Sequence, residues 1–423
     1  MKKLISVLMA IIMLVLTACT QPVSAGILQS EKPRVTEPQA SQADLATLVD
    51  GNSEFAFGLY HALGDTDGNL FYSPHSISLA LAMTYAGARG DTEEQMADTV
   101  RFLPAQNDLH PAFNILDIEL ASRGEEAKGK DEEGFRFNIV NTIWGQKDYV
   151  FISEFLDTLA ENYGTGLRIL DFIQAPEESR ITINNWVSDQ TEERIKDLIP
   201  QGTIDALTRL ILTNAIYFNA AWQFPFDEDA TADGTFYLLN DGETTVPMMR
   251  QTESFGYTEG DNYQAVELTY DGRELSMVIL LPASGQLETF EDSIDYRKVD
   301  GIISELENHQ ISLTMPKFKY ESEFSLKRAL TEMGMPIAFT TNADFSGMTG
   351  NQDLFIDEVI HKAFVSVDET GTEAAAATAV IMSLTAIPAE PIPVTLDRPF
   401  VFLIRDIETG VILFIGRVLN PLS

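Results

Sequence analysis

Three observations on the sequence predict an α+β fold with mainly antiparallel sheets. Helical spacing of apolar residues dominates the first half of the chain, whereas alternation of the β type dominates the second half. The two patterns mix without the regular strand-helix-strand order of a parallel sheet. The nearly continuous apolar run at 207–218 predicts a buried central strand.

The expected helices follow from apolar positions that recur every three or four residues. Thr92 and Gln95 have the spacing of a capping box and predict the start of one of them. The segments with this periodicity are 54–63, 76–88, 93–102, 111–123, 154–163, 177–198 and 324–334.

The expected strands are rich in branched and aromatic residues and lie between turn residues such as Asp271-Gly272. Because turns this short join neighbouring strands, most pairs are expected to be antiparallel. The segments are 135–144, 207–218, 246–257, 263–270, 275–281, 311–318 and 354–367.

The composition indicates one large acidic domain. Hydrophobic residues make up 45% of the 423 residues, and no internal linker is apparent after residue 50. The chain carries 64 Asp and Glu against 28 Lys and Arg, a formal net charge of −36. Because phosphate binding needs clustered basic residues, this balance argues against nucleic acid and anionic lipid as partners. It favours a cationic partner surface.

The N-terminus has the plan of a secretory signal, with two lysines followed by an apolar run at 4–16 that is too short to span a membrane. Leu16-Thr17-Ala18-Cys19 resembles the bacterial lipobox, in which the cysteine becomes the lipidated first residue. The alternative is cleavage after Ala25, which would discard Cys19. We therefore expect a signal peptide at 1–18, a flexible tether at 19–48 and a domain at 49–423, lipid-anchored to the cell envelope on its extracytoplasmic side or else secreted.

Cys19 is the sole cysteine, so no disulfide can form within the chain and folding must rest on burial of the core.

Motifs of catalysis and metal binding are scarce. The sequence contains no G-x-S-x-G, P-loop, G-x-G-x-x-G or H-E-x-x-H motif. Asp229, Thr231 and Asp233 imitate the start of a calcium loop, but Asn240 stands where the bidentate Glu is required. We therefore expect a protein that is not an enzyme, with no cofactor and no metal site. A hydrolase triad assembled in space remains the alternative.

The segment 374–389 carries no charge, which is unusual in so acidic a chain and predicts that it can be buried. Read at period two, the face that starts at Thr372 carries only small or apolar side chains, whereas Glu373 begins the other face. This pattern is typical of a strand with one face in a core. The alternative is an Ala-rich helix capped by Thr370 or Thr372.

Motifs along the chain from about residue 50 resemble those of the serpin family, in the family's order. One departure is Asn219-Ala220-Ala221 before Trp222, where the family usually has a Lys-Gly pair. The matching motifs are NLFYSPHSI (69–77), NTIWGQ (141–146), INNWV (183–187), LTNAIYF (212–218), VPMM (246–249), MPKF (315–318), IHKAFVSVDETGTEAAAAT (360–378), RPF (398–400) and FIGRVLNP (414–421).

The resemblance implies the serpin fold for residues 49–423, with three mainly antiparallel β-sheets, about eight or nine helices and an exposed reactive-centre loop at about 369–393. It also implies a polar cluster, the shutter, where the central sheet parts, and a breach near Trp222. His361, which by itself reads as a satisfied core histidine, joins Ser73, Ser76 and Asn214 in this shutter.

The resemblance further implies a loop hinge that enters the central sheet after a protease cuts the loop. Gly371 is expected to give freedom at the pivot. Thr372, the first inward-facing residue, is expected to lie near solvent until insertion. The hinge residues are Glu369, Gly371, Thr372, Glu373, Ala374, Ala375, Ala376, Ala377 and Thr378.

The implied function is suicide-substrate inhibition of a serine, or else cysteine, protease through a covalent acyl complex. The family register places the reactive bond at Thr385-Ala386, with Leu384, Met382 and Ser383 as rivals. Because no basic or acidic residue lies near this bond, we expect target proteases of elastase-like or subtilisin-like preference. We also expect the inhibitor to be a monomer. The alternatives are a non-inhibitory serpin that acts as a binding module and an extracytoplasmic hydrolase.

Overall fold

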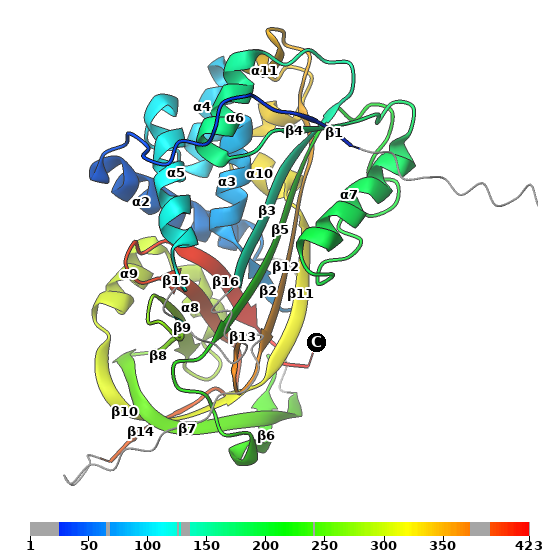
Figure 1. The fold of residues 1–423 in the computed structure, drawn as a ribbon. Helices are drawn as coiled ribbons and strands as arrows, with labels where there is room; N and C mark the ends of the chain where they lie inside the picture. Colours follow the sequence, from blue (N-terminus) through cyan, green and yellow to red (C-terminus); the bar gives the residue numbers. More distant parts are fainter. Residues whose placement is uncertain are drawn as a thin grey trace, which may run out of the picture.

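The α+β fold is confirmed by a computed structural model, which describes residues 25–64, 68–124, 127, 136–239, 242–372 and 390–422. Ten α-helices and two short 3-10 helices lie among these residues (Figure 1). The α-helices are α2 (Gln42–Ala62), α3 (Pro74–Tyr85), α4 (Gly90–Val100), α5 (Gln106–Ala121), α6 (Ser153–Tyr163), α7 (Pro176–Gln190), α8 (Leu287–Ser293), α9 (Tyr296–Ser304), α10 (Lys327–Met333) and α11 (Ser346–Thr349), and the 3-10 helices are η1 (Glu228–Ala230) and η2 (Pro336–Phe339).

A seven-stranded sheet, here called sheet A, forms the long spine of the molecule (Figure 1). Helices α2 to α6 lie on one side of this spine and α7 on the other. In spatial order its strands are β1 (Gly26–Leu28), β4 (Leu167–Leu170), β3 (Arg136–Gln146), β5 (Leu210–Ala221), β13 (Gly371–Thr372), β12 (Ile356–Val367) and β11 (Phe318–Ser325).

The second sheet has nine strands and fills the lower half of Figure 1. Three sheets were expected, but the 18-residue β7 pairs with β6 and β10 and then with β8, which joins two of them into one. Its strands are β14 (Ile392–Thr395), β10 (Glu307–Pro316), β7 (Glu243–Gly260), β8 (Tyr263–Thr269), β9 (Leu275–Pro282), β15 (Phe400–Asp406), β16 (Ile412–Val418) and β2 (Leu70–Tyr72), with β6 (Ala232–Tyr237) beside β7.

Antiparallel pairing dominates both sheets, as predicted. Only β3 with β4, β5 with β12 and β10 with β14 run parallel among the described strands. The parallel pair of β5 and β12 lies at the centre of sheet A, and each of these strands is mostly buried. This pair positions the functional site.

Helix α3 lies in the core between the two sheets, and all of its twelve residues are buried. It begins at Pro74, whose missing N–H costs nothing in the first turn of a helix. Its N-cap is Ser73, whose hydroxyl accepts a hydrogen bond from the backbone N–H of Ser76 at 3.1 Å. The motif at 69–77 therefore fixes the start of this helix against sheet A.

Several expected element boundaries are wrong; for example, the helices expected to start at residues 54 and 111 begin at Gln42 and Gln106. The helix predicted at 177–198 ends at Gln190, because Glu192 and Glu193 adopt positive φ; Ile195 and Leu198 are buried from an irregular segment. The expected capping box does not form either. The hydroxyl of Thr92 accepts instead from the backbone N–H of Asp344 at 2.8 Å.

Residues 25–41, expected to be part of a flexible tether, run along α5, α6 and β4 as a strap. Strand β1 pairs with β4, and the backbone N–H of Val35 donates to the carbonyl oxygen of Glu161 at 2.8 Å. Ser41 then caps α2 through a reciprocal pair of bonds with Asp44. Packing and hydrogen bonding therefore replace the expected disorder from residue 25 onward.

Within the described residues, no helix is long and apolar enough to cross a membrane. Nor do the same residues contain a group of three or more His, Cys, Asp or Glu that could hold a metal ion.

The core gives a first testable prediction at Phe71, which is fully buried and stacks on Phe414 with ring centroids 4.9 Å apart. Phe71→Ala should lower the free energy of unfolding by about 3–5 kcal/mol, because it leaves a cavity between the sheets. Urea unfolding followed by circular dichroism measures the loss. Leu239→Ala, at a side chain that is 46% exposed, is the control and should change stability little. Equal losses in the two variants would contradict this description of the core.

Candidate functional site

The central strands β5 and β12 are paired at one end of sheet A and parted at the other. Their parallel register runs from Leu210 and Ile356 to Tyr217 and Phe364. Beyond that point β13 lies between them, with Thr372 opposite Ala220 of β5 and opposite Val367 of β12. The sheet therefore already accepts the first two residues of a further strand.

Four residues predicted to form the shutter are brought together at the closed part of this pair. Ser73, Ser76, Asn214 and His361 are all fully buried. The imidazole Nδ1 of His361 lies 2.5 Å from Oδ1 of Asn214, directly across the β5–β12 boundary. The side-chain amide of Asn214 donates to the hydroxyl of Ser76 at 2.7 Å. The structure thus brings the four residues together, and their role in the parting of the sheet stays a prediction.

The contacts of His361 fix its tautomer. Nε2 accepts a hydrogen bond from the backbone N–H of Ser73 at 3.3 Å, so the proton resides on Nδ1 and is donated to Asn214. Burial lowers the pKa of His361 to about 3. The ring is therefore neutral at physiological pH, and each of its nitrogens has a partner.

Sequence reasoning missed one member of the cluster, Asn141 of β3. Its Oδ1 accepts from both Asn214 and Ser76, and its Nδ2 donates to the carbonyl oxygen of Ser76 at 3.1 Å. Asn141 opens the NTIWGQ motif, and as a polar residue in a strand of apolar neighbours it was the available signal.

The hinge of the loop is held beside Trp222, as expected for the breach. The indole N–H of Trp222 donates to the carbonyl oxygen of Asp368 at 3.0 Å, and its backbone N–H donates to that of Thr370 at 2.8 Å. The ring stacks on Tyr270 at a centroid distance of 4.7 Å. These bonds tie the start of the hinge to the residue that follows β5.

Glu369 anchors the hinge on its other side. Its carboxylate accepts from Lys317 Nζ at 2.6 Å and from the hydroxyl of Thr231 at 2.7 Å. Burial alone would raise the pKa of Glu369, but the hydrogen bonds from Lys317 and Thr231 outweigh it and hold the pKa below its usual value. The carboxylate is therefore charged and paired at neutral pH.

Gly371 was expected to give the backbone freedom at the pivot, and it also allows β13 to lie close to β5. A Cβ atom there would lie 2.1 Å from the carbonyl oxygen of Ala220 and 2.7 Å from Cα of Ala221. Any other residue would push β13 away from β5. The unusual Asn219-Ala220-Ala221 segment does not disturb the strand, because β5 continues to Ala221 and pairs there with Gly371.

The expectation that Thr372 lies near solvent is wrong. Thr372 is fully buried, and its hydroxyl lies 2.8 Å from the hydroxyl of Tyr270. Burial raises the pKa of Tyr270, so its hydroxyl keeps its proton. Because β13 has already entered the sheet, Thr372 occupies an inward position before any cleavage.

A segment that follows α7 crosses the outer face of sheet A where β5 and β12 meet. The guanidinium of Arg194 lies over the ring of Tyr217 on β5, 5.8 Å from its centroid. Lys362 of β12 donates to the carbonyl oxygen of Lys196 at 3.2 Å. Any widening of the sheet between these strands must therefore loosen or shift this segment.

Other predicted site residues lie outside the residues that the structure describes. They are the hinge residues Glu373, Ala374, Ala375, Ala376, Ala377 and Thr378, the reactive-bond candidates Met382, Ser383, Leu384, Thr385 and Ala386, and the lipidation residue Cys19.

Comparisons with known proteins identify a family. The family model described as Serpin (serine protease inhibitor) matches residues 50–421. An uncharacterized serpin-like protein of Thermococcus kodakarensis is 40% identical over 377 residues, which is 88% of this chain and 86% of the relative. The human leukocyte elastase inhibitor is 38% identical over 386 residues, with 88% and 99% of the two chains covered. The solved structure of tengpin, a thermophilic serpin in its native state, is similar with a TM-score of 0.82 at 28% identity, and the match covers 94% of this chain and 100% of tengpin.

The buried histidine yields a pH prediction. Burial lowers the pKa of His361 in the folded protein from 6.5 to about 3, so between these pH values only the unfolded chain binds the proton. The contribution of His361 to stability is therefore complete above pH 6.5 and falls as the pH drops toward 3. The non-titrating variant His361→Asn lacks this loss. Its deficit in free energy of unfolding relative to the parent should shrink by about 2 kcal/mol between pH 6 and pH 4.5, at about 1.4 kcal/mol per pH unit.

Chemical unfolding of both proteins at several pH values measures this difference. His309→Asn is the control, since His309 is exposed on β10 and its replacement should leave the pH profile parallel to that of the parent. A parallel profile for His361→Asn as well would contradict the assignment of a neutral buried imidazole.

Proposed function

Because the chain belongs to the serpin family, we propose that it is an inhibitory serpin that traps a serine protease as a covalent acyl complex. The observation that carries this proposal is β13, the two hinge residues that already lie between β5 and β12. The next inward-facing residues in the sequence, Ala374 and Ala376, have the small side chains that further entry into the sheet requires.

The register of β13 predicts where each hinge residue would go. Thr372 is opposite Ala220, so antiparallel continuation along β5 would place Ala374 opposite Phe218 and Thr378 opposite Asn214. On the other side, continuation from the pair of Thr372 and Val367 would place Thr378 opposite His361. A threonine hydroxyl would then enter between the two shutter residues whose bond the new strand breaks.

This replacement is chemically balanced. Insertion separates Nδ1 of His361 from Oδ1 of Asn214, which would leave a buried donor and a buried acceptor unsatisfied. A hydroxyl can accept from one partner and donate to the other. Thr378 would therefore let the sheet open without orphaned polar groups.

The covalent step belongs to the target protease. Its serine oxygen attacks the carbonyl carbon of the reactive residue, Thr385 in the family register, and the peptide bond to Ala386 breaks as the nitrogen of Ala386 takes up a proton. The new ester keeps the protease attached to the N-terminal side of the cut. Insertion of that side as a strand would then carry the protease away before water can release it.

The target class follows from the residues around the reactive bond. The segment 382–387 contains no basic or acidic side chain, which disfavours trypsin-like proteases. The similarity to leukocyte elastase inhibitors supports the same class. We propose proteases of elastase-like or subtilisin-like preference.

A matched pair of hinge variants tests insertion. Ala374→Glu would carry a carboxylate to a position opposite Phe218, whose ring packs in the core against Tyr270 and Phe414, at a cost of several kcal/mol. Ala375→Glu is the control, since its side chain would point to the opposite face, beside Arg194 and Tyr217. We expect Ala374→Glu to be cut at the parent's bond while losing most of the SDS-resistant adduct with elastase, whereas Ala375→Glu keeps it.

Equal adduct yields for the two variants would contradict the inward register. A parent protein that is cut by elastase and subtilisin without any adduct would favour a non-inhibitory binding module. Turnover of an ester or peptide substrate in the absence of protease would favour a hydrolase.

We also propose that Cys19 is lipidated and holds the protein on the outer side of a membrane. The support is the sequence Leu16-Thr17-Ala18-Cys19 directly after an apolar run. Mass spectrometry of the mature protein should find Cys19 as a diacylglyceryl-modified first residue. An unmodified N-terminus at Gly26 would contradict the proposal.

A further inference from the structure

The strap of residues 25–41 determines where the chain leaves the folded body. Lys32 forms ion pairs with Asp157 and Glu161 of α6 at 3.0 and 3.1 Å. Nε of Arg34 donates to Oδ1 of the fully buried Asn114 at 2.8 Å. These contacts and the pairing of β1 with β4 fix the position of Gly26, so that only the six residues 20–25 lie between Cys19 and the start of β1.

The exit point lies at the end of sheet A that is remote from the loop hinge. Ile27 pairs with Arg168 of β4, which is level with Trp144 of β3 and thereby with Ile211 of β5. The hinge pairs with β5 at Ala220, nine positions farther along the strand, or about 30 Å. Figure 1 shows β1 near the upper end of the molecule and β13 and β14 in the lower half.

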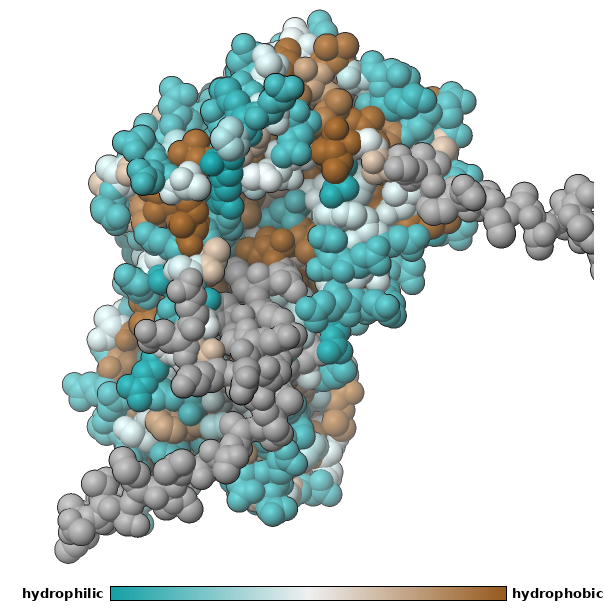
Figure 2. Space-filling model, viewed as in Figure 1, coloured by the Kyte–Doolittle hydropathy of each residue, from teal (hydrophilic) through white to brown (hydrophobic). Residues whose placement is uncertain are grey.

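Large apolar side chains are exposed at this exit end. Val150 is 81% exposed, Leu207 is 71% exposed and Ile27 is 53% exposed. The backbone of Gln146, where β3 ends, donates to the carbonyl oxygen of Arg209 at 2.9 Å, which places the chain before Val150 beside the chain after Leu207. Figure 2 shows apolar surface near this end and at other places on the same face.

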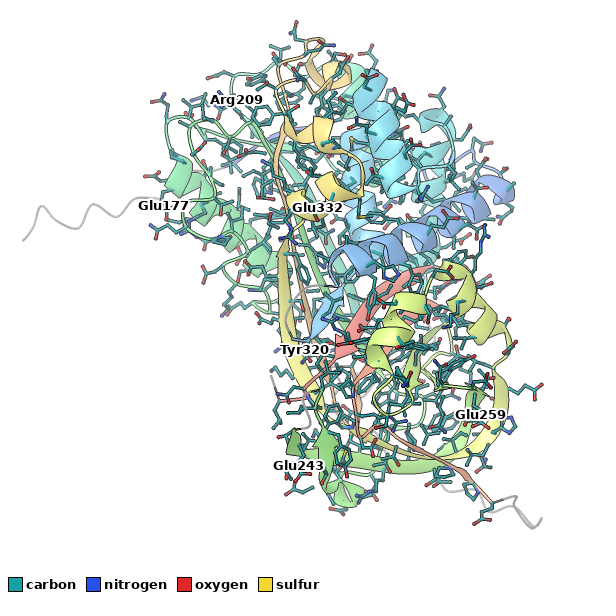
Figure 3. All side chains as sticks on the ribbon, turned by 180° about the vertical axis from the view of Figure 1, so that it is seen from behind. Glu177, Arg209, Glu243, Glu259, Tyr320 and Glu332 are labelled. Carbon is teal, nitrogen blue, oxygen red and sulfur yellow. The ribbon has the colours of Figure 1, made fainter. Side chains whose placement is uncertain are left out.

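The charges around these residues are mixed in sign. Lys147 and Arg209 lie near Val150 and Leu207 in sequence, but so do Asp148 and Asp205, and Lys147 is paired with Asp171 at 3.1 Å. Long basic side chains such as Arg209 can bury their stems while their heads stay in water. Figure 3 shows Arg209 at this end, with Glu177 and Glu332 in the same half of the molecule and Glu243 and Glu259 in the other half. The net charge of the chain excludes attraction to anionic lipid as the source of affinity.

We propose that this exit end of sheet A, with Ile27, Val150 and Leu207, is the membrane-facing surface of the protein, and that the loop hinge at β13 therefore lies at the end of the sheet remote from the membrane. The inference rests on the proposed lipidation of Cys19. Seven residues from Cys19 to Ala25 reach at most about 23 Å, so the anchor can bring only this end to the lipid. The anchor supplies the affinity and the three apolar side chains supply the orientation.

The full chain, lipidated at Cys19 in a host that processes lipoproteins and reconstituted in phosphatidylcholine vesicles, provides the test. Lipidation consumes the only native thiol, so a single new cysteine can carry an environment-sensitive NBD dye. The test variants are Val150→Cys and Leu207→Cys. The matched control is Leu239→Cys, also an exposed leucine but next to β6 at the opposite end.

We expect spin-labelled phosphatidylcholine to quench the dye at positions 150 and 207 several-fold more strongly than at position 239. Adding Ile27→Asp to the Val150→Cys protein should reduce this quenching while the protein still floats with the vesicles. Equal quenching at all three positions, or none at any, in protein that floats would overturn the orientation alone. Protein that fails to float would overturn the lipid anchor and the orientation with it, and leaves the protease-trapping result, obtained in solution, unaffected.

Discussion

The pairing of β5 with β12 is the constraint on which the rest of the structure depends. Both strands are buried, so their backbone groups can separate only if a third strand supplies replacement hydrogen bonds. Strand β13 already does this at one end, opposite Ala220 and Val367. At the closed end the strands are also joined by the side chains of Asn214 and His361. Separation of β5 from β12 is therefore coupled to entry of the hinge, because a strand that extends β13 would supply the hydrogen bonds that the two strands lose.

The same geometry positions the start of the hinge. Asp368, Glu369 and Thr370 are tied to Trp222, Phe226 and Lys317 by backbone and side-chain bonds, so the chain turns sharply before Gly371 enters. Thr372 then finds a hydroxyl partner in Tyr270, and farther along the sheet β12 is paired directly with Tyr217 and Asn214. Each further residue of entry would have to replace one pair of this ladder. In the proposed mechanism, cleavage of the loop would allow this replacement, because the new strand would add hydrogen bonds and buried side chains to the sheet.

The sequence predicted most of the fold and the shutter because short motifs encode both. Ser73-Pro74 fixes a helix start, and a lone histidine in an apolar strand needs buried polar partners. That Asn214 is such a partner of His361 was implied only by the resemblance to serpins. Tyr270 and Lys317 could not, because their roles arise from strands that are distant in sequence and meet only in the fold. The strap was missed for a different reason: Gln29 to Ser41 is polar and rich in turn residues, and its order comes from partners such as Asn114 and Glu161 that composition does not reveal. Thr372 was expected near solvent because the alternation of side chains along a strand predicts which face a residue occupies. It does not predict how many residues of the strand have entered the sheet.

Insertion of the loop and the proposed orientation on the membrane both involve the strap of residues 25–41. If the hinge inserts in the register of β13, residue 382 arrives opposite Leu210, so the acylated residue and its protease end beside the surface that we propose faces the membrane. A protease of about 250 residues is on the order of 45 Å across, whereas the tether from Cys19 to Ala25 allows about 23 Å. Release of the strap would extend the tether to the 23 residues from Cys19 to Ser41, about 76 Å. Because Lys32 is 49% exposed and its ion pairs are screened by water, they add little to the stability of the strap. Its release would instead have to break the bonds of Arg34 and Val35 to Asn114 and the pairing of β1 with β4. On a membrane, trapping would then require the strap to leave α5, α6 and β4.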